Sequence, residues 1–358
     1  MTGSNIKIEQ LDLFVNGEGG YNTYRIPAII TTTNGTMLAF CEGRKHGADD
    51  FGEIDILLRR STDGGKTWSK FQTVASEKGM TCGNPCPVVD ASDGTVWLPF
   101  CKNLADGPEE MILRGEAPRT VWITKSTDDG LAWSQPIEIT GQTKLPDWTW
   151  YATGPCHGIQ LRDGRLVIPC DHVVGNTPRY HSHVILSDDH GKSWRIGGIV
   201  DEGTNESAVV ETEDGAVYIN CRNFGEPPQK RAYAWSHDGG ETFCEVARDE
   251  TLIEPVCQAG LARFTSRTRH SWNRVLFSNP ANGVRVNMTV RMSYDECRTW
   301  PVAKALYSGA SSYSDIAIAP DMTICCIYEN GEIYPCERLT LARFNVEWLT
   351  DGKDTIEG

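Results

Sequence analysis

Hydrophobic residues along the chain gather in short runs that turn-forming residues interrupt. Clear examples lie at residues 54–60, 183–186 and 287–292, all rich in aliphatic and β-branched side chains. Runs of this length, bounded by glycine, aspartate and serine, predict β-strands. No long segment has the 3.6-residue spacing of an amphipathic helix. The pattern therefore predicts an all-β chain.

One short pattern, Ser-x-Asp-x-Gly-x-Thr-Trp, recurs along the sequence. Its five copies begin 65, 61, 49 and 57 residues apart, at Ser61, Ser126, Ser187, Ser236 and Ser293. In such a turn the aspartate accepts backbone hydrogen bonds, the glycine supplies a positive φ, and the tryptophan covers the space between sheets. The fifth copy has Cys297 where the others have glycine. We therefore expect that turn to be strained or altered.

Repeats at this spacing predict a radial arrangement of small sheets. Five copies in 358 residues suggest a six-bladed β-propeller with four antiparallel strands in each blade, forming one domain over residues 1–358. The sixth blade, which lacks a copy, would combine the two chain ends. Residues 341–349 would form its late strand and residues 11–15 the partner. Such closure hides the sheet edges.

Composition narrows the classes of function. The net charge is −14 and no cluster of lysine or arginine is visible, so we expect no nucleic-acid partner. The sequence contains no run of 18 apolar residues, so we expect no membrane span. The first residues do not resemble a signal peptide. We expect a cytoplasmic protein, or a secreted one if a leader has been removed.

The 13 cysteines do not form a zinc-ligand set. Only Cys82 and Cys86 are closely spaced, apart from the adjacent Cys325 and Cys326, and no histidines complete either pair. Cysteine in strands is usually a small buried hydrophobic residue. We expect no metal site and no cofactor.

The segment that first indicates a function is Tyr-Arg-Ile-Pro-Ala at residues 24–28, which precedes an acidic loop and the first repeat. This segment resembles the [FY]-R-I-P motif of the bacterial and mammalian exo-sialidases, or neuraminidases, and the resemblance extends over essentially the whole chain. It implies a sialidase-like propeller that removes terminal sialic acid from glycans. Sialic acid carries a carboxylate on its anomeric carbon, and arginine pairs with carboxylates in a bidentate manner. The resemblance assigns this task to Arg25, Arg222 and Arg285.

The same resemblance supplies the catalytic residues. Tyr313 would be the nucleophile, which in sialidases is a tyrosine instead of the usual carboxylate. A neutral phenol avoids repulsion by the substrate's carboxylate if a base takes its proton. Glu206 would be that base, since Glu211 faces the other side of a regular strand. Asp50 would be the acid/base that protonates the leaving oxygen and then activates water, with Asp49 left open as an alternative.

Supporting roles follow in the same way. Arg44 would lie at the rim near the substrate carboxylate or N-acyl group, and Glu329 would pair with Arg25 and hold its guanidinium. Residues 148–151, an aromatic cluster, would contact the substrate or pack between blades. Residues 83–87 resemble a segment that lines the N-acyl pocket.

Three alternatives remain open at this point. A propeller could bind sialic acid without catalysis, or a trans-sialidase could transfer it to an acceptor sugar. A hydrolase could also act on a deaminated or other nonulosonic acid, which the segment around residues 82–87 would decide.

Overall fold

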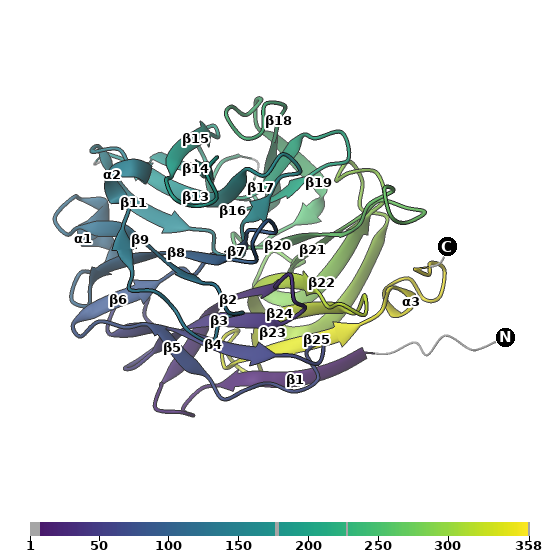
Figure 1. The fold of residues 1–358 in the computed structure, drawn as a ribbon, viewed down its shortest axis with the longest axis horizontal. Coiled ribbons are helices and arrows are strands. Elements are labelled where there is room, and N and C mark those ends of the chain that lie inside the picture. The colour runs from purple at the N-terminus through teal and green to yellow at the C-terminus, as the bar shows by residue number, and fades with distance from the viewer. Residues whose placement is uncertain (1–7, 176–178, 227, 357–358) are drawn as a thin grey trace.

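The computed structural model describes residues 8–175, 179–226 and 228–356 (Figure 1). Within these residues the chain forms 25 β-strands and three short helices. The helices are α1 (Glu109–Leu113), α2 (Thr140–Thr143) and α3 (Val346–Leu349). The all-β prediction is confirmed. None of the helices in the described part of the chain is long and apolar enough to cross a membrane.

The strands pair into six consecutive antiparallel units of four, the blades of a propeller. The first three blades are β2 (Thr23–Thr31), β3 (Met37–Arg44), β4 (Ile54–Ser61) and β5 (Gln72–Ala75); β7 (Val88–Val89), β8 (Val96–Leu104), β9 (Arg119–Ser126) and β10 (Ile137–Glu138); and β12 (Ile159–Gln160), β13 (Leu166–Val174), β14 (Arg179–Ser187) and β15 (Arg195–Ile199).

The other three blades are β16 (Thr204–Glu211), β17 (Val217–Asn223), β18 (Lys230–Ser236) and β19 (Ala247–Ile253); β20 (Gly260–Thr265), β21 (Arg274–Pro280), β22 (Val286–Ser293) and the first part of β23 (Val302–Ile318); and the second part of β23 with β24 (Ile324–Gly331), β25 (Arg338–Phe344) and β1 (Ile8–Val15). Two further strands extend blades, namely β6 (Met80–Gly83) beside β8 and β11 (Trp148–Thr153) beside β13.

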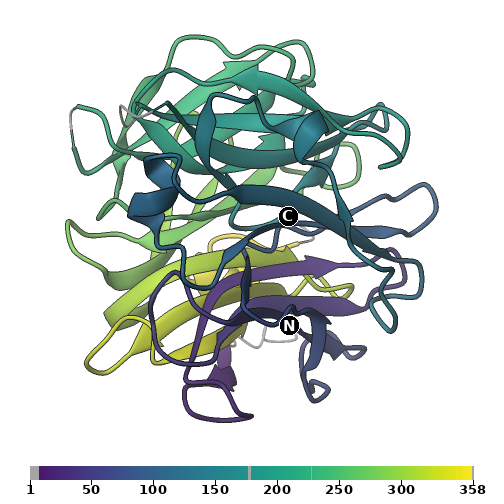
Figure 2. The same ribbon diagram turned by 90° about the vertical axis from the view of Figure 1, so that its left-hand side faces the viewer.

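The two chain ends close the ring, as the sequence predicts. β1 pairs antiparallel with β25, with Leu11 opposite Leu341. The first and last parts of the chain lie side by side in both views (Figure 2). The prediction of a strand as far as residue 349 is wrong, because β25 ends at Phe344 and helix α3 follows. The Asn345 side chain accepts a hydrogen bond from the Trp348 N–H at 3.0 Å and so caps that helix.

The repeat turns share one set of hydrogen bonds. In the first copy, Ser61 Oγ donates to Asp63 at 2.8 Å and accepts from the Gly65 N–H at 2.9 Å. The fifth copy keeps this arrangement, with the Cys297 N–H donating to Ser293 Oγ at 3.0 Å. Cys297 does so at φ +65°, a conformation that favours glycine. The preceding Glu296 also has a positive φ, +60°, so the expected strain lies in the backbone of these two residues, while the hydrogen bonds of the turn are unchanged.

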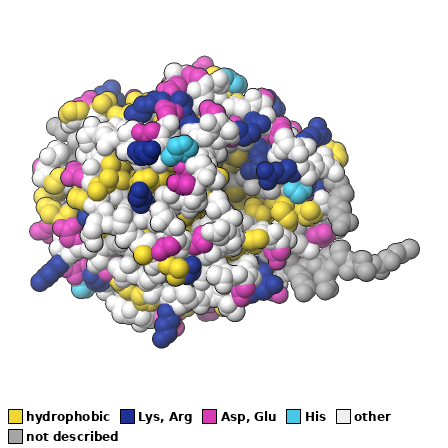
Figure 3. Space-filling model, in the orientation of Figure 1, with side chains coloured by type: hydrophobic (Ala, Val, Ile, Leu, Met, Phe, Trp, Pro, Cys, Tyr) yellow, Lys and Arg dark blue, Asp and Glu magenta, His cyan; other side chains and the backbone are white. Residues whose placement is uncertain are grey.

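The hydrophobic core lies between neighbouring blades, where the inner faces of their strands pack together. Eleven of the 13 cysteines are buried and all are free thiols. Over the face shown in Figure 3, acidic and basic side chains are interspersed. Local groups of positive charge are therefore compatible with the net charge of −14.

The third blade buries a pair of histidines. His172 Nδ1 and His183 Nδ1 lie 3.0 Å apart, so one ring donates and the other accepts. The His172 ring also stacks on Trp148, with 3.5 Å between centroids. Burial and the neighbouring imidazoles lower the pKa of His172, and they lower that of His183 to about 3. Burial therefore keeps both imidazoles neutral in the folded blade near neutral pH.

We expect this pair to make the fold sensitive to acid. Below pH 6.5 the unfolded chain binds protons on both imidazoles and the folded blade does not. The free energy of unfolding should therefore fall by about 1.4 kcal/mol per pH unit for each histidine, from pH 6.5 towards the folded pKa. The double variant His172→Phe/His183→Leu should flatten the pH dependence of Tm between pH 6.5 and 4.5, followed by circular dichroism. The exposed His237→Gln variant is the control. An unchanged slope in the double variant would contradict the assignment.

Candidate active site

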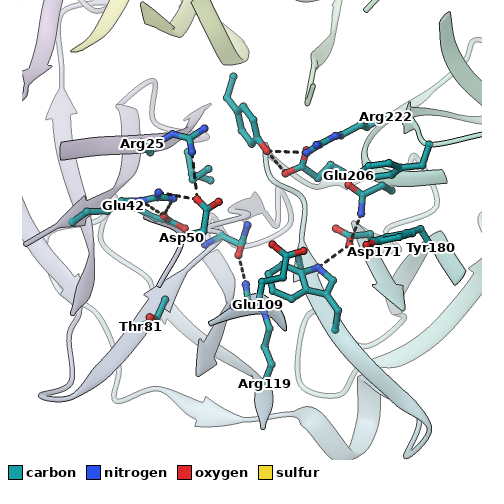
Figure 4. Close-up of a pocket in the computed structure, with 18 of the residues that line it drawn as sticks. Arg25, Glu42, Asp50, Thr81, Glu109, Arg119, Asp171, Tyr180, Glu206 and Arg222 are labelled. Atoms are coloured by element: carbon teal, nitrogen blue, oxygen red, sulfur yellow. Dashed lines mark hydrogen bonds and ion pairs between the residues drawn. The ribbon is translucent and has the colours of Figure 1, made fainter. Parts of the chain in front are cut away.

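A cavity of about 280 Å³ lies where the inner strands of several blades meet (Figure 4). Its wall contains residues that are far apart in the sequence, from the first blade to the last. Seven of the eight residues predicted for the site line it: Arg25, Arg44, Asp50, Glu206, Arg222, Arg285 and Tyr313. The eighth, Glu329, lies directly behind Arg25.

A phenol, a carboxylate and a guanidinium form a compact group in this cavity. Tyr313 Oη donates to Glu206 Oε1 at 2.6 Å, and Arg222 Nη1 donates to Glu206 Oε2 at 2.7 Å and to Tyr313 Oη at 3.2 Å. Burial raises the pKa of Tyr313, the charge of Glu206 raises it further, and nearby arginines only partly offset this. Tyr313 is therefore a neutral phenol whose proton already points at a carboxylate oxygen.

Arg25 is held rigidly by a buried carboxylate. Its Nε and Nη2 donate to Glu329 Oε1 and Oε2 at 3.1 and 3.2 Å, and Glu329 is fully buried. The expected contact between the two side chains is thus present. The same carboxylate accepts from the N–H groups of Ile26 at 2.9 Å and of Tyr313 at 3.3 Å. One carboxylate thereby fixes an arginine of the first blade and the tyrosine of the sixth.

A bulge in β2 explains how Arg25 reaches the cavity. The register of β2 with β3 shifts between Arg25 and Ala28, and Ile26 has φ +57°. Pro27 has no N–H to offer the ladder. A bulge breaks the regular alternation of side chains and re-aims one of them. Here it leaves the Ile26 N–H free for Glu329.

Arg285 completes a ring of three guanidiniums around the tyrosine. Its Nη1 donates to Ser312 Oγ at 3.1 Å and its Nη2 to the Val256 carbonyl at 3.4 Å. The guanidinium carbons of Arg25 and Arg285 lie 5.1 and 5.6 Å from the centre of the Tyr313 ring. Converging guanidiniums in a sheltered cavity form a binding site for an anion, and for a carboxylate in particular.

Asp50 lies opposite the tyrosine, on the loop between β3 and β4. Its Oδ1 lies 2.7 Å from Arg44 Nη1 and 3.3 Å from Arg25 Nη1. Desolvation in the cavity raises the pKa of Asp50, but the charges of Arg44 and Arg25 outweigh this effect and hold the pKa below its ordinary value. Both aspartates are exposed to solvent, and only Asp50 lines the cavity. Of the two aspartates, Asp50 is the one in a position to act on a bound molecule.

The structure corrects the predicted position of Arg44 and agrees with the predicted orientation of Glu211. The prediction of Arg44 at the rim is wrong, since the residue is only 2% exposed. Its Nη2 lies 2.7 Å from Glu42 Oε2, and this carboxylate compensates the buried charge. Glu211 points away from the cavity and pairs with Arg162 at 3.1 Å, as expected from its spacing to Glu206.

The cavity wall away from Arg25, Arg222 and Arg285 also contains polar residues that belong to no sequence motif. Arg119 lies in it with its guanidinium 4.1 Å from the centre of the Trp150 ring and its Nη2 bonded to Asn84. The residues of the aromatic segment 148–151 therefore differ in position. Trp150 lines the cavity, and Trp148 packs in the core. Sequence reasoning missed further lining residues that come from the second, third and fourth blades: Glu109, Arg119, Asp171, Tyr180, Asn205 and Phe224.

Asp171 is the most unusual of these residues. It is fully buried, and its Oδ1 accepts from Trp150 Nε1 at 3.1 Å and from Asn205 Nδ2 at 2.9 Å. Among the described residues, its Oδ2 has no hydrogen-bond partner. Burial raises the pKa of Asp171 well above its usual value, and the nearby Glu206 adds to the effect. The fold therefore favours the protonated acid.

Substitution of Asp171 by asparagine should stabilise the protein at high pH. A carboxyl whose pKa rises on folding costs stability as the pH increases above its unfolded pKa of about 3.9. The amide keeps the shape and the acceptor oxygen without that cost. The Tm of the Asp171→Asn variant should exceed that of the wild type at pH 7–8, and the gap should close towards pH 4. The exposed Asp106→Asn variant should show no such gap, and a pH-independent gap for Asp171→Asn would argue against a raised pKa.

Comparison with known proteins agrees with this geometry. Residues 35–326 match the family described as BNR repeat-like domain. The chain is 35% identical to a sialidase of Micromonospora viridifaciens over 94% of its own length, and it spans about half (54%) of that protein. It is 30% identical to an exo-alpha-sialidase of Aspergillus fumigatus, covering 93% of this chain and 86% of that one.

The structure of Hadza microbial sialidase Hz136 superimposes with a TM-score of 0.85 at 28% identity, covering 95% of this chain and 69% of the other. The likeness thus includes the repeat turns, the six blades and the sequence over most of the chain. The chain belongs to the sialidase family.

Proposed function

We propose that this protein is an exo-sialidase, a hydrolase that releases terminal sialic acid from glycans with retention of configuration at the anomeric carbon. The observation that carries the proposal is the 2.6 Å hydrogen bond from Tyr313 Oη to Glu206, inside a ring of three guanidiniums. A buried nucleophile with its base already in contact, beside a carboxylate-binding group, is suited to a 2-keto sugar acid. The names of the relatives support the same reaction.

Substrate binding begins with the carboxylate. Arg25, Arg222 and Arg285 would bind it together, which holds the anomeric carbon over Tyr313. Because Glu329 and Glu206 already orient two of these guanidiniums, little side-chain freedom is lost on binding. The cavity of about 280 Å³ has room for one terminal sugar, in keeping with exo action.

The first chemical step forms a bond from Tyr313 Oη to the anomeric carbon and breaks the bond to the glycan oxygen, which takes a proton from Asp50. Glu206 takes the phenol proton as the nucleophile attacks, and Arg222, bonded to both groups, stabilises the charge that moves between them. In the second step, water activated by Asp50 attacks the same carbon. Tyr313 then leaves and regains its proton from Glu206. Two inversions give overall retention.

Asp50 must carry a proton when the glycan leaves, yet the cations beside it favour its ionised form. Substrate binding resolves this conflict. A carboxylate bound to Arg25 supplies negative charge next to Asp50 and offsets the field of that guanidinium. The pKa of Asp50 should therefore rise in the complex, where the proton is needed.

Tyr313→Phe should abolish catalysis without removing binding. We expect kcat on the 4-methylumbelliferyl conjugate of N-acetylneuraminic acid to fall at least about 10³-fold, because the substitution removes the nucleophilic oxygen. The control is Tyr307→Phe, which removes a phenol that bonds the Gly331 carbonyl away from the cavity. It should retain wild-type turnover.

An inert wild type, tested also on the deaminated analogue, would overturn the hydrolase proposal in favour of a binding propeller. Product analysis by NMR separates the remaining possibilities. Release of the free sugar as its α-anomer supports retaining hydrolysis. A sialylated acceptor or an internally bridged product would instead indicate a transferase.

The adjacent aspartates allow a matched test of the acid/base. Asp50→Asn should lower kcat on a sialylated disaccharide by about 10²-fold or more, and less on the aryl conjugate, whose leaving group needs no proton. Asp49→Asn, one residue away and outside the cavity, should change kcat less than about threefold. Equal losses on both substrates for Asp50→Asn, or a larger loss for Asp49→Asn, would overturn the assignment.

A further inference from the structure

Arg285 differs from the other two guanidiniums in how it is held. Arg25 has Glu329 and Arg222 has Glu206, at 3.1 and 2.7 Å. Within the described residues, no carboxylate lies in ion-pair distance of Arg285. Its acceptors are two neutral oxygens, Ser312 Oγ and the Val256 carbonyl. Of the three, Arg285 thus keeps the most uncompensated charge for a bound anion.

The Val256 carbonyl reaches Arg285 only because the backbone there is unusual. Val256 has φ +53°, in the left-handed region. A β-branched residue in that region is a genuine outlier, because its side chain crowds its own backbone. Such a conformation persists only where the surroundings impose it, and it is often found at functional sites.

A buried ion pair imposes the turn. Arg231 and Glu254 are both fully buried, and Arg231 Nη1 lies 2.7 Å from Glu254 Oε2. The same Nη1 donates to the Cys257 carbonyl at 2.5 Å, and the Cys257 N–H donates to Glu254 Oε2 at 3.3 Å. Both ends of the segment 254–257 are therefore fixed to one pair of charges, with Val256 between them.

The Arg231–Glu254 pair also contacts the strand that carries Arg222. Glu254 Oε1 accepts from the N–H of Asn223 at 2.7 Å, and Asn223 directly follows Arg222 in β17. Arg231 Nε donates to Asn220 Oδ1 at 2.7 Å in the same strand. The strand end that carries Arg222 and the turn that orients Arg285 are thus joined by the same two side chains.

We propose that the Arg231–Glu254 pair is a positioning device for the substrate carboxylate, which acts by holding Val256 in the turn that aims its carbonyl at Arg285. This inference rests on the proposed function. Neither residue lines the cavity, so both act through Arg285 and Arg222. The device sets binding of the carboxylate, while Tyr313 and Glu206 keep their own contacts.

The test neutralises both partners, because a single change would leave an unpaired buried charge and destabilise the fold. In Arg231→Met/Glu254→Gln we expect KM for the methylumbelliferyl conjugate to rise about tenfold or more, with kcat changed less than about threefold. Affinity for free N-acetylneuraminic acid, measured by calorimetry, should fall by the same factor as KM rises.

A matched control is the pair Arg274 and Asp354, at 2.5 Å, in which Arg274 is fully buried and Asp354 is partly buried, and which does not line the cavity. Arg274→Met/Asp354→Asn should lower Tm but leave KM and affinity unchanged. A rescue separates positioning from general destabilisation. Adding Val256→Gly to the first double variant should recover much of the lost affinity, because glycine adopts a positive φ without help.

Three results would overturn the inference: an unchanged KM in the Arg231/Glu254 variant, an equal rise in the Arg274/Asp354 control, or a failure of Val256→Gly to restore affinity. The wild-type assay tests the proposed function separately. If the wild type binds N-acetylneuraminic acid but does not hydrolyse the conjugate, calorimetry of the same variants still decides the positioning role. If it does not bind, both proposals fail.

Discussion

Repulsion among three guanidiniums is the constraint on which the rest of the site depends. Arg25, Arg222 and Arg285 converge on one phenol in a cavity where water cannot fully screen them. The protein compensates them in different ways, by carboxylates at the first two and by neutral oxygens at the third. One of those carboxylates, Glu206, also accepts the hydrogen bond of the Tyr313 phenol. The group that compensates a guanidinium is therefore also the group that we propose as the base.

Ring closure brings these groups together. Glu329 on β24 contacts Arg25 on β2 and the backbone of Tyr313 on β23, so the first and sixth blades meet at one carboxylate. That meeting requires the sixth blade to be complete, with β1 paired to β25. The contacts of Arg25 and Tyr313 with Glu329 thus depend on how the first and the last blade pack together.

Much of this could be predicted from sequence, because the relevant signals were local or repeated. The repeat turns gave the blades, and the segment around Arg25 marked the site through a short motif. Asp171 and Arg119 had no such signal, since each is a single polar residue whose importance comes from burial and from neighbours on other strands. Residues 341–349 mix apolar residues with Arg343, Asn345 and Glu347, a pattern compatible with a strand, and the Asn345 cap marks where the strand ends and the helix begins. Val256 could not be found at all, because a β-branched residue argues locally against the conformation it adopts.

The pairing of β1 with β25 also has a consequence for biosynthesis. β1 is synthesised before its partner β25, which follows it by more than 300 residues. At ordinary translation rates that wait is on the order of tens of seconds. Until β25 has been made, β1 has no native partner strand. Its unpaired backbone N–H and C=O groups can then pair with wrong strands. The cavity wall contains residues from the first blade to the last, so the complete site can form only after the last blade has been made, and chaperone protection of the unpaired strand should matter for the yield of folded protein.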